Sequence, residues 1–297
     1  MNGSATDQES PMHNKVCLVT GASSGIGRAT AKALAAKGAE VFVLVRNRAK
    51  GEALLQELSR ETGNNRLHLL VGDLSSQQDI RRVAAEFLAT GKPLQVLVNN
   101  AGLINTRLRR TPDGIEEMFA VNHLGYFLLT QLLRPRLVES APARIVSVSS
   151  GAHAFIKRLQ LDDLAFERSG YRAFPAYGHS KLCNLLWNRE LSRQLQGSGV
   201  TANCLHPGAV GTGLGTQNAA WARFVTALLR PFFRTPERGA SSSIHLATAP
   251  EVEGVSGKYY YDCRPIRPKP WAEDDAAAKE LWTLSEKMTG LGERNLL

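Results

Sequence analysis

Short apolar runs recur along the chain between longer amphipathic segments, and this alternation constrains the fold more than any other feature. Each run is rich in Val, Ile and Leu without regular alternation, as expected of strands that are covered on both faces. Each intervening segment is long enough for a crossover helix. The pattern predicts an α/β fold, a doubly wound (Rossmann-type) parallel sheet with helices on both faces. The six runs are residues 15–20, 40–45, 66–71, 94–99, 144–149 and 200–205.

The chain of 297 residues shows no internal repeat and no Pro/Gly/Ser-rich linker that would divide it. We therefore predict one domain over residues 14–297, preceded by a polar, disordered leader over residues 1–13. A last strand is expected over Lys258–Tyr261 and a closing helix over Pro270–Thr289.

Composition excludes several classes of protein. No apolar run reaches the roughly 20 residues needed to span a bilayer, and the polar start lacks the apolar core of a signal peptide. We expect a cytoplasmic, soluble protein, with peripheral membrane contact left open. The net charge is +9, but the basic residues are dispersed, so an anionic cofactor is a simpler partner than nucleic acid. The four cysteines form no C-x-x-C pair, which predicts reduced thiols and no metal site.

A glycine motif follows the first predicted strand. Residues 20–27 read TGASSGIG and open a helix expected over residues 28–37. Glycines at 21, 25 and 27 permit a tight turn that brings backbone amides and a helix N-terminus to a diphosphate. Packing alone is the alternative explanation of the glycines, but their place after the first strand favours dinucleotide binding.

The end of the second predicted strand indicates which dinucleotide. An acidic residue there would accept a hydrogen bond from a ribose hydroxyl, whereas the chain has Arg46, whose planar guanidinium suits a phosphate. This favours NADP(H), with Ser23, Ser24 and Arg48 in assisting positions. Asp73, just past the third run, is a candidate for the adenine edge, or alternatively a helix cap.

Tyr177 and Lys181 lie one helical turn apart, which places both on one face of a helix. A lysine ammonium near a phenol favours its ionised form, and a phenol tuned in this way can exchange a proton with an alcohol or carbonyl. By itself the spacing is weak evidence, because it also occurs by chance on amphipathic helices. Ser150, at the end of the fifth run, is the third member of the candidate site.

In order and spacing, these motifs resemble those of the short-chain dehydrogenase/reductase family from about Lys15 to Thr289. The resemblance rests on the glycine motif, Asp73, the NNAG sequence, Asn122, Ser150, the Tyr-x-x-x-Lys pair and the Pro-Gly pair, at residues 20–27, 73, 99–102, 122, 150, 177–181 and 207–208.

The resemblance implies a role for each matched residue. Tyr177 is then the general acid/base, Lys181 lowers its pKa and holds the nicotinamide ribose, and Ser150, rather than Ser149, bonds the substrate oxygen. Asn122 is expected to hold a water that links Lys181 to a proton relay. The implied cofactor contacts are Gly21, Ser23, Ser24, Gly25, Ile26, Gly27, Arg46, Asp73, Leu74, Asn100, Ala101, Gly102, Tyr177, Lys181, Pro207, Gly208, Val210 and Thr212.

More narrowly, residues 148–153, 176–184 and 203–208 are similar to the retinol dehydrogenase branch. That similarity implies NADP and lipophilic aldehydes, ketones or alcohols, retinal among them. A small substrate lid is expected over about 211–238, where residues 221–234 carry one apolar stripe opposite arginines. The stripe fits a lid first, a membrane contact second and plain packing third.

Other side chains have two interpretations each. His153, Phe155, Phe174 and Leu214 are candidate pocket walls or ordinary packing. His179 and His206 are expected to be satisfied structural groups. The helices expected over about 115–137 and 176–195 leave a homodimer open, since their apolar faces could equally be core.

The sequence thus predicts an NADP(H)-dependent oxidoreductase that transfers a hydride between nicotinamide and a carbonyl or alcohol, with a small lipophilic substrate. The alternative is a catalytically silent dinucleotide-binding regulatory or scaffold protein. The complete set of Asn122, Ser150, Tyr177 and Lys181 disfavours that alternative, because a protein that only binds needs no acid/base.

Overall fold

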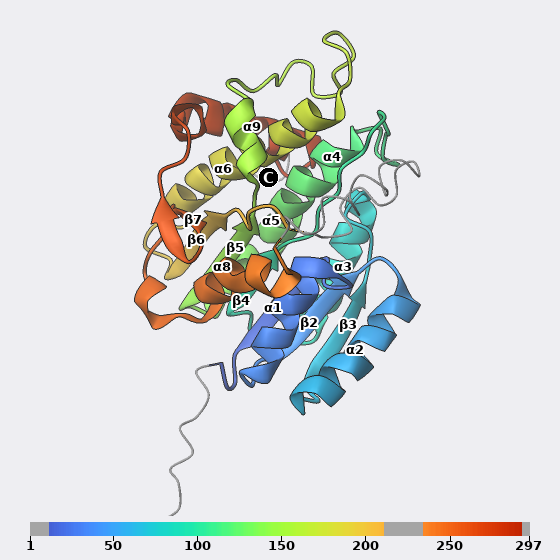
Figure 1. Ribbon diagram of the computed structural model, residues 1–297, viewed down its shortest axis with the longest axis vertical. Helices are drawn as coiled ribbons and strands as arrows, with labels where there is room; N and C mark the ends of the chain where they lie inside the picture. The colour runs from blue at the N-terminus through green and yellow to red at the C-terminus, as the bar shows by residue number, and fades with distance from the viewer. Residues whose placement is uncertain (1–11, 211–233, 293–297) are drawn as a thin grey trace, which may run out of the picture.

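The computed structural model describes residues 12–210 and 234–292. Within them one eight-stranded sheet has the order β3-β2-β1-β4-β5-β6-β7-β8, and every pairing is parallel except that of β7 with β8 (Figure 1). The chain order reverses between β1 and β4, so the sheet is doubly wound, as predicted. The strands are β1 (Val16–Thr20), β2 (Glu40–Val45), β3 (Leu67–Val71), β4 (Val96–Asn99), β5 (Ala143–Val148), β6 (Val200–Leu205), β7 (Tyr259–Tyr261) and β8 (Arg264–Ile266).

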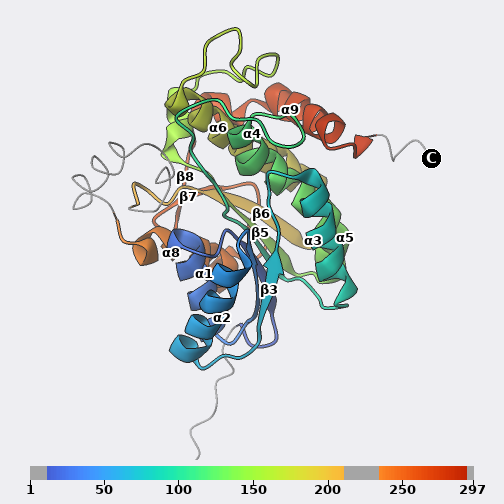
Figure 2. The same cartoon turned by 90° about the vertical axis from the view of Figure 1, so that its right-hand side faces the viewer.

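Helices cover both faces of the sheet and enclose two apolar cores. One core joins the sheet to α1, α2 and α8, and the other joins it to α3, α5, α6 and α9 (Figure 2). The longer helices are α1 (Gly25–Ala36), α2 (Arg48–Thr62), α3 (Gln77–Ala89), α5 (Gly125–Glu139), α6 (Ala173–Gln194), α8 (Pro236–Thr248) and α9 (Asp275–Met288). The shorter ones are α4 (Glu117–Phe119), the π-helix η1 (Ala120–Leu124), and the 3-10 helices η2 (Gly151–Phe155), η4 (Pro250–Val252) and η5 (Pro270–Glu273).

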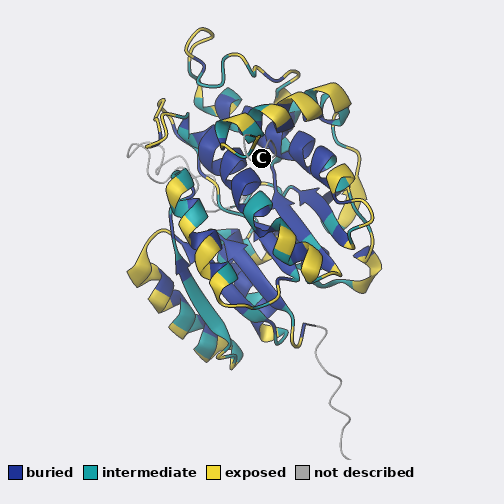
Figure 3. Cartoon of the chain, turned by 180° about the vertical axis from the view of Figure 1, so that it is seen from behind, coloured by how far each residue is buried: buried dark blue, intermediate teal, exposed yellow. Residues whose placement is uncertain are grey.

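Burial follows this layering. The strands are mostly buried, and exposed residues gather on the outer sides of the helices (Figure 3). This explains why the strand runs are near-continuous in Val, Ile and Leu, since both of their faces meet helices. A single domain results.

The structure differs from the sequence-based expectations at several boundaries. The predicted last strand is followed by β8, an antiparallel partner that its exposed, proline-containing sequence did not indicate. The closing helix begins at Asp275 rather than Pro270, because Asp274 caps it and the preceding residues form η5. At the other end, Met12 falls within the predicted leader but is buried in the α1/α2 core. Residues 211–233, which include most of the expected lid and its apolar stripe, lie outside the described residues.

Two other expectations concern surfaces. No described helix combines the length and the apolar character that crossing a membrane requires. The apolar face of α6 is core, because α6 packs against α9 and η2 and most of its residues are buried.

All four cysteines are free thiols, and three of them are buried.

Candidate active site

The glycine turn between β1 and α1 forms one wall of the candidate site. Gly21 and Gly25 adopt positive φ angles of 65° and 55°, a conformation that glycine tolerates best. Gly27 is required by packing, because a Cβ there would lie 2.4 Å from the carbonyl oxygen of Gly21. Backbone conformation therefore favours glycine at positions 21 and 25, whereas a close contact requires it at position 27.

The N-terminus of α1 opens onto this turn without a side-chain cap. Ser24 occupies the N-cap position but makes no capping hydrogen bond, and the first turn holds no acidic residue. By contrast, Asn47 caps α2 and Ser76 caps α3 through their side chains. Free amide groups and the positive end of the helix dipole make the start of α1 suited to a diphosphate. Ser23 and Ser24 are exposed beside it.

The Thr20 hydroxyl fastens the glycine turn to the loop after β4. It accepts hydrogen bonds from the backbone N–H groups of Asn100 at 2.8 Å and Ala101 at 3.0 Å, and donates to the Val98 carbonyl. The Asn100 side chain donates in turn to the carbonyls of Thr20 and Gly21. Asn100, predicted as a cofactor contact, thus uses its side-chain amide to hold the two loops together.

Because two partly buried N–H groups depend on this hydroxyl, Thr20→Val should be costly. We expect the free energy of unfolding to fall by about 2–4 kcal/mol, since each unsatisfied donor costs roughly 1–3 kcal/mol, and dinucleotide affinity to fall with it. Thr30→Val is the matched control, because the equally buried Thr30 hydroxyl serves only the Ile26 carbonyl of its own helix. Urea unfolding of both variants measures the difference; equal losses would contradict the fastening role.

Arg46 and Asp73 follow the neighbouring strands β2 and β3. Arg46 is exposed, and its guanidinium lies 4.0 Å from an Asp73 carboxylate oxygen. The other Asp73 oxygen accepts the Ser75 N–H within its own loop. Ser76, not Asp73, caps the following helix, so the cap interpretation of Asp73 is wrong. Leu74 is buried against Gly125, so its side chain is a core group.

Tyr177, near the start of α6, meets the end of β5 at Ser150. An interaction with the Ser150 hydroxyl lowers the pKa of the Tyr177 phenol, which indicates that the two side chains are neighbours. The neighbouring Ser149 is buried and donates to the Lys181 carbonyl oxygen at 2.7 Å, so its hydroxyl is already used. Successive strand residues point to opposite faces, which explains why only one of the two serines reaches the phenol.

Gly178 lets η2 approach α6 closely enough for this contact. A Cβ at Gly178 would lie 2.8 Å from Ile156 Cγ1 and 2.9 Å from the Ala152 carbonyl oxygen. The absent side chain therefore sets the spacing between Ser150, which precedes η2, and Tyr177. The sequence shows a glycine inside the Tyr-x-x-x-Lys motif, but the spacing of the motif did not reveal that this glycine is needed for packing.

Lys181 lies beneath Tyr177 and beside the NNAG loop. Its buried ammonium donates to the Val148 carbonyl at 3.0 Å and lies 5.8 Å from the centre of the Tyr177 ring. A Cβ on Gly102 would be 3.5 Å from this nitrogen and 3.3 Å from the Asn122 side-chain oxygen. Gly102 thus leaves the space in which Lys181 and Asn122 approach the loop.

Asn122 sits in the π-helix η1, a widened turn of a kind often found at functional sites. Its amide donates to the Leu103 carbonyl and the Ser180 hydroxyl, both at 3.0 Å, and its oxygen accepts the Leu103 N–H. The side-chain amide is therefore held in place by protein groups. Ser180, like Thr20 and Tyr126, supports the site without having been predicted; the Tyr126 hydroxyl donates to the Ala101 carbonyl.

The pKa of Tyr177 shifts in the direction opposite to that expected from its pairing with Lys181. Burial raises the pKa of the phenol, and the Ser150 hydrogen bond opposes that rise only in part. The Lys181 ammonium donates to the Val148 carbonyl and makes no hydrogen bond to Tyr177 among the described residues. Burial also lowers the pKa of Lys181 to about 8.

The lowered pKa of Lys181 makes stability depend on pH. Below pH 8 the lysine is charged in both states, and the folded state carries the full cost of burying that charge. Between about 8 and 10.5 the unfolded chain holds a proton on this lysine that the folded chain has released, so the contribution of Lys181 to the free energy of unfolding should rise by about 3 kcal/mol across this range. Lys181→Met should remove this contribution and stabilise the protein at neutral pH by about 1–3 kcal/mol, reduced by the carbonyl partner it loses.

Chemical denaturation at several pH values measures this effect. Lys279→Met, an exposed substitution on α9, is the matched control and should leave the pH profile of the wild type unchanged. The assignment is contradicted if the difference in free energy of unfolding between wild type and Lys181→Met stays constant between pH 8 and 10.5.

The remaining predicted contacts follow β6. Gly208 has a φ of 77°, and a Cβ there would lie 2.9 Å from the Arg234 side chain. Val210 pairs with Arg234 in an isolated parallel bridge and packs with Ile26. Pro207 lies between this loop and the strand, whereas Thr212 falls outside the described residues.

The histidines are structural, as expected. His179 is buried, its Nε2 accepts the Gln160 N–H at 2.9 Å, and burial lowers its pKa to about 4. His206 accepts the Gly208 N–H and stacks on Tyr261, with ring centroids 4.2 Å apart.

Of the candidate pocket walls, two are exposed aromatics. Phe155 is 71% exposed and Phe174 is 50% exposed, and their ring centroids lie 5.5 Å apart. Phe174 precedes Tyr177 by three residues and so shares its helix face. His153 is instead buried against Tyr259, and Leu214 lies outside the described residues.

Comparisons with known proteins agree with this geometry. Residues 15–160 match the short chain dehydrogenase family. Retinol dehydrogenase 12 of Mus musculus is 44% identical over 277 residues, covering 93% of this chain and 87% of the relative. Retinol dehydrogenase 14 of Homo sapiens is 43% identical, covering 94% and 88% respectively.

Solved structures show the same fold. The crystal structure of an uncharacterized protein from Mycobacterium Paratuberculosis is 32% identical and matches with a TM-score of 0.76, covering 97% of this chain and 98% of that one. The Pseudomonas aeruginosa RhlG/NADP active-site complex is 27% identical with a TM-score of 0.67, covering 85% and 96%.

The chain therefore belongs to the short-chain dehydrogenase/reductase family, as its motifs predict. Within that family it falls in the retinol dehydrogenase-like branch, and it is a dinucleotide-dependent oxidoreductase that acts on alcohol or carbonyl groups.

Proposed function

We propose that the protein reduces a lipophilic aldehyde or ketone with NADPH, using Tyr177 as the proton donor. The observation that carries this proposal is the cluster in which the Tyr177 phenol interacts with Ser150 while Lys181 approaches Gly102 of the loop fastened to the glycine turn. A bound nicotinamide dinucleotide supplies the hydride at such a site. Contacts through Lys181 and Gly102 thus link the acid/base Tyr177 to the cofactor-binding loops.

In this mechanism each side chain has a role that its contacts support. Ser150 bonds the substrate oxygen, and Tyr177 gives that oxygen a proton as the carbonyl is reduced. Lys181 holds the nicotinamide ribose from beneath, and Asn122 positions the Leu103 backbone next to it. The raised pKa of Tyr177 keeps the phenol protonated at neutral pH, which favours the reductive direction.

The choice of NADP(H) rests on Arg46. Its guanidinium is exposed at the end of β2, and the residues that follow, Asn47 and Arg48, supply no carboxylate for a ribose hydroxyl. Arg48 is partly engaged, at 3.7 Å from Glu52. The Asp73 carboxylate beside Arg46 keeps the guanidinium near the strand ends, where a 2′-phosphate would compete for it. The NADP complex of the RhlG structure supports the same choice.

The lipophilic substrate class rests on the two exposed phenylalanines and on the retinol dehydrogenase relatives. Phe155 and Phe174 lie between Ser150 and Tyr177 in sequence, and a bound apolar substrate would shield their exposed rings from water. Retinal is the reference substrate that these relatives suggest. A homodimer through α6 is disfavoured, because α9 already covers it.

Purified protein assayed for NADPH oxidation with a panel of aldehydes and ketones tests the proposal. We expect turnover to increase with the apolar size of the carbonyl substrate and to be lower with NADH. Tight NADPH binding without turnover of any carbonyl would instead support the binding-only alternative, a regulatory or scaffold protein.

A further inference from the structure

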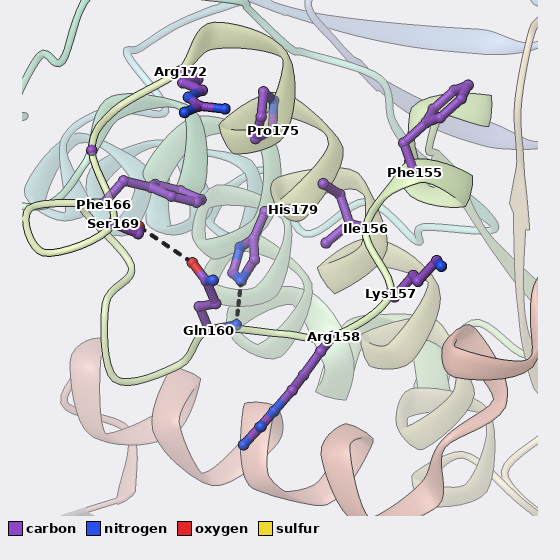
Figure 4. Close-up of a pocket in the computed structure, with 11 residues that line it drawn as sticks. Phe155, Ile156, Lys157, Arg158, Gln160, Phe166, Ser169, Arg172, Pro175 and His179 are labelled. Atoms are coloured by element: carbon purple, nitrogen blue, oxygen red, sulfur yellow. Dashed lines mark hydrogen bonds between the residues drawn. The ribbon is translucent and has the colours of Figure 1, made fainter.

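A pocket of about 380 Å³ lies beside the N-terminal turn of α6 (Figure 4). Its apolar surface comes from Ile156, Phe166 and Pro175, and its centre holds the hydrogen bond between Gln160 and His179. The volume falls within the range of small-molecule sites, roughly 300–1,000 Å³. Phe155 lines this pocket as well as the substrate side, but the reaction proposed above uses none of the other lining residues.

The pocket lies on the side of α6 away from Tyr177. Residues advance by about 100° around a helix axis, so His179 and Pro175 are each displaced by about 160–200° from Tyr177. Lys181, one turn on, shares the face of Tyr177 instead. The pocket is therefore separate from the catalytic face of the same helix.

Three cations surround the pocket, and among the described residues none of their side chains makes an ion pair or hydrogen bond. They are Lys157, Arg158 and Arg172, and they lie on different sides of the cavity in Figure 4. Nearby carboxylates are engaged elsewhere, since Asp162 pairs with Arg168 and Glu167 pairs with Arg110. Among the described residues that line the pocket, none is acidic.

The start of α6 adds a second, independent feature that favours an anion. Arg172 occupies the N-cap position, no side chain caps the helix, and the first turn lacks an acidic residue. The N–H groups of Ala173 and Phe174 have no acceptor within the described parts of the chain. A cation at a helix N-terminus opposes the helix dipole, and a bound anion would relieve both this repulsion and the unsatisfied amides.

We propose that this pocket is a second ligand site, which takes an amphiphilic anion: a phosphate or carboxylate head group on a short apolar body. The head group binds the free amides of α6 and the Arg172 guanidinium, and the body packs on Ile156, Phe166 and Pro175. Arg158 and Lys157 add positive charge at the rim. The same chemistry is offered by a free single-chain amphiphile and by the head group of a bilayer lipid.

Titration calorimetry with octyl phosphate tests the site without depending on turnover, so its result is distinguishable from failure of the proposed reaction. We expect saturable binding that is weaker for octanol, which lacks the charge, and for inorganic phosphate, which lacks the apolar body. Arg172→Ala should weaken the binding about tenfold, the size expected for a lost charge-assisted hydrogen bond.

Arg168→Ala is the matched control, because Arg168 lies on the same segment but is held by Asp162. It should bind octyl phosphate like the wild type, and unchanged NADPH binding in both variants shows that they fold. Equal affinity of wild type, Arg172→Ala and Arg158→Ala, or no octyl phosphate or vesicle binding by the wild type, would overturn the proposal.

Vesicles distinguish the two sources of the ligand. Phosphatidylcholine vesicles with phosphatidylserine should sediment the wild type but not Arg172→Ala if the head group of a bilayer lipid is the ligand. Binding of octyl phosphate without vesicle sedimentation assigns the site to a free amphiphile.

Discussion

Replacing Tyr177 with phenylalanine should lower kcat for carbonyl reduction on the order of 10³-fold, within the range that general acid catalysis contributes. The substitution removes only the hydroxyl that interacts with Ser150 and gives the proton, while the ring can still pack over Lys181. NADPH affinity should stay near that of the wild type. Steady-state assays, with NADPH binding followed by fluorescence, separate the two effects.

Tyr171→Phe is the matched control for this experiment. Tyr171 precedes α6 and its hydroxyl contacts Asn105 and Glu116 rather than Ser150. Its loss should leave kcat within a few fold of the wild type. Unchanged turnover in Tyr177→Phe would remove Tyr177 from the mechanism, and an equal loss in both variants would indicate a general disturbance of α6.

Arg46→Asp should change the cofactor preference. If Arg46 makes a bidentate contact with the 2′-phosphate, its loss should reduce kcat/KM for NADPH by about 10–100-fold or more, from roughly 1.5–3 kcal/mol of charge-assisted hydrogen bonding. An aspartate also repels the phosphate and accepts a ribose hydroxyl, so kcat/KM for NADH should stay constant or rise.

Arg60→Asp provides the control, since it makes the same change in net charge at an exposed position near the far end of α2. Cofactor preference in this variant should match the wild type. The NADP(H) assignment fails if Arg46→Asp and Arg60→Asp have equal kcat/KM values for NADPH, or if the wild type prefers NADH.

The order of apolar runs predicted the sheet correctly because parallel strands buried on both faces leave a strong signal in sequence. Strand ends and short elements were harder to predict from the sequence. β8 has exposed residues and a proline, so nothing in its composition marks it as a strand; only its pairing with β7 defines it. The start of α9 depended on whether Asp274 or Pro270 began the helix, which local sequence left open.

Within the site, residue identity predicted the reactive groups better than it predicted the contacts that hold those groups in place. The Tyr-x-x-x-Lys spacing identified two partners on one helix face, yet it could not show that burial outweighs Lys181 in setting the pKa of Tyr177. Likewise, the glycine motif indicated a cofactor turn, but it did not indicate that the Thr20 hydroxyl binds the loop after β4. The residues that it contacts there lie about 80 positions further along the chain. Such contacts depend on tertiary packing, which motif spacing does not contain.

The short strand β8 also bears on how the molecule behaves in concentrated solution. An open sheet edge is a template on which another chain can add a strand, and aggregation begins at long, flat, apolar edges. Here the last strand has three exposed residues, Arg264 to Ile266, with a proline in the middle and an arginine at its start. At this edge the sheet is thus protected from growing into a continuous intermolecular sheet.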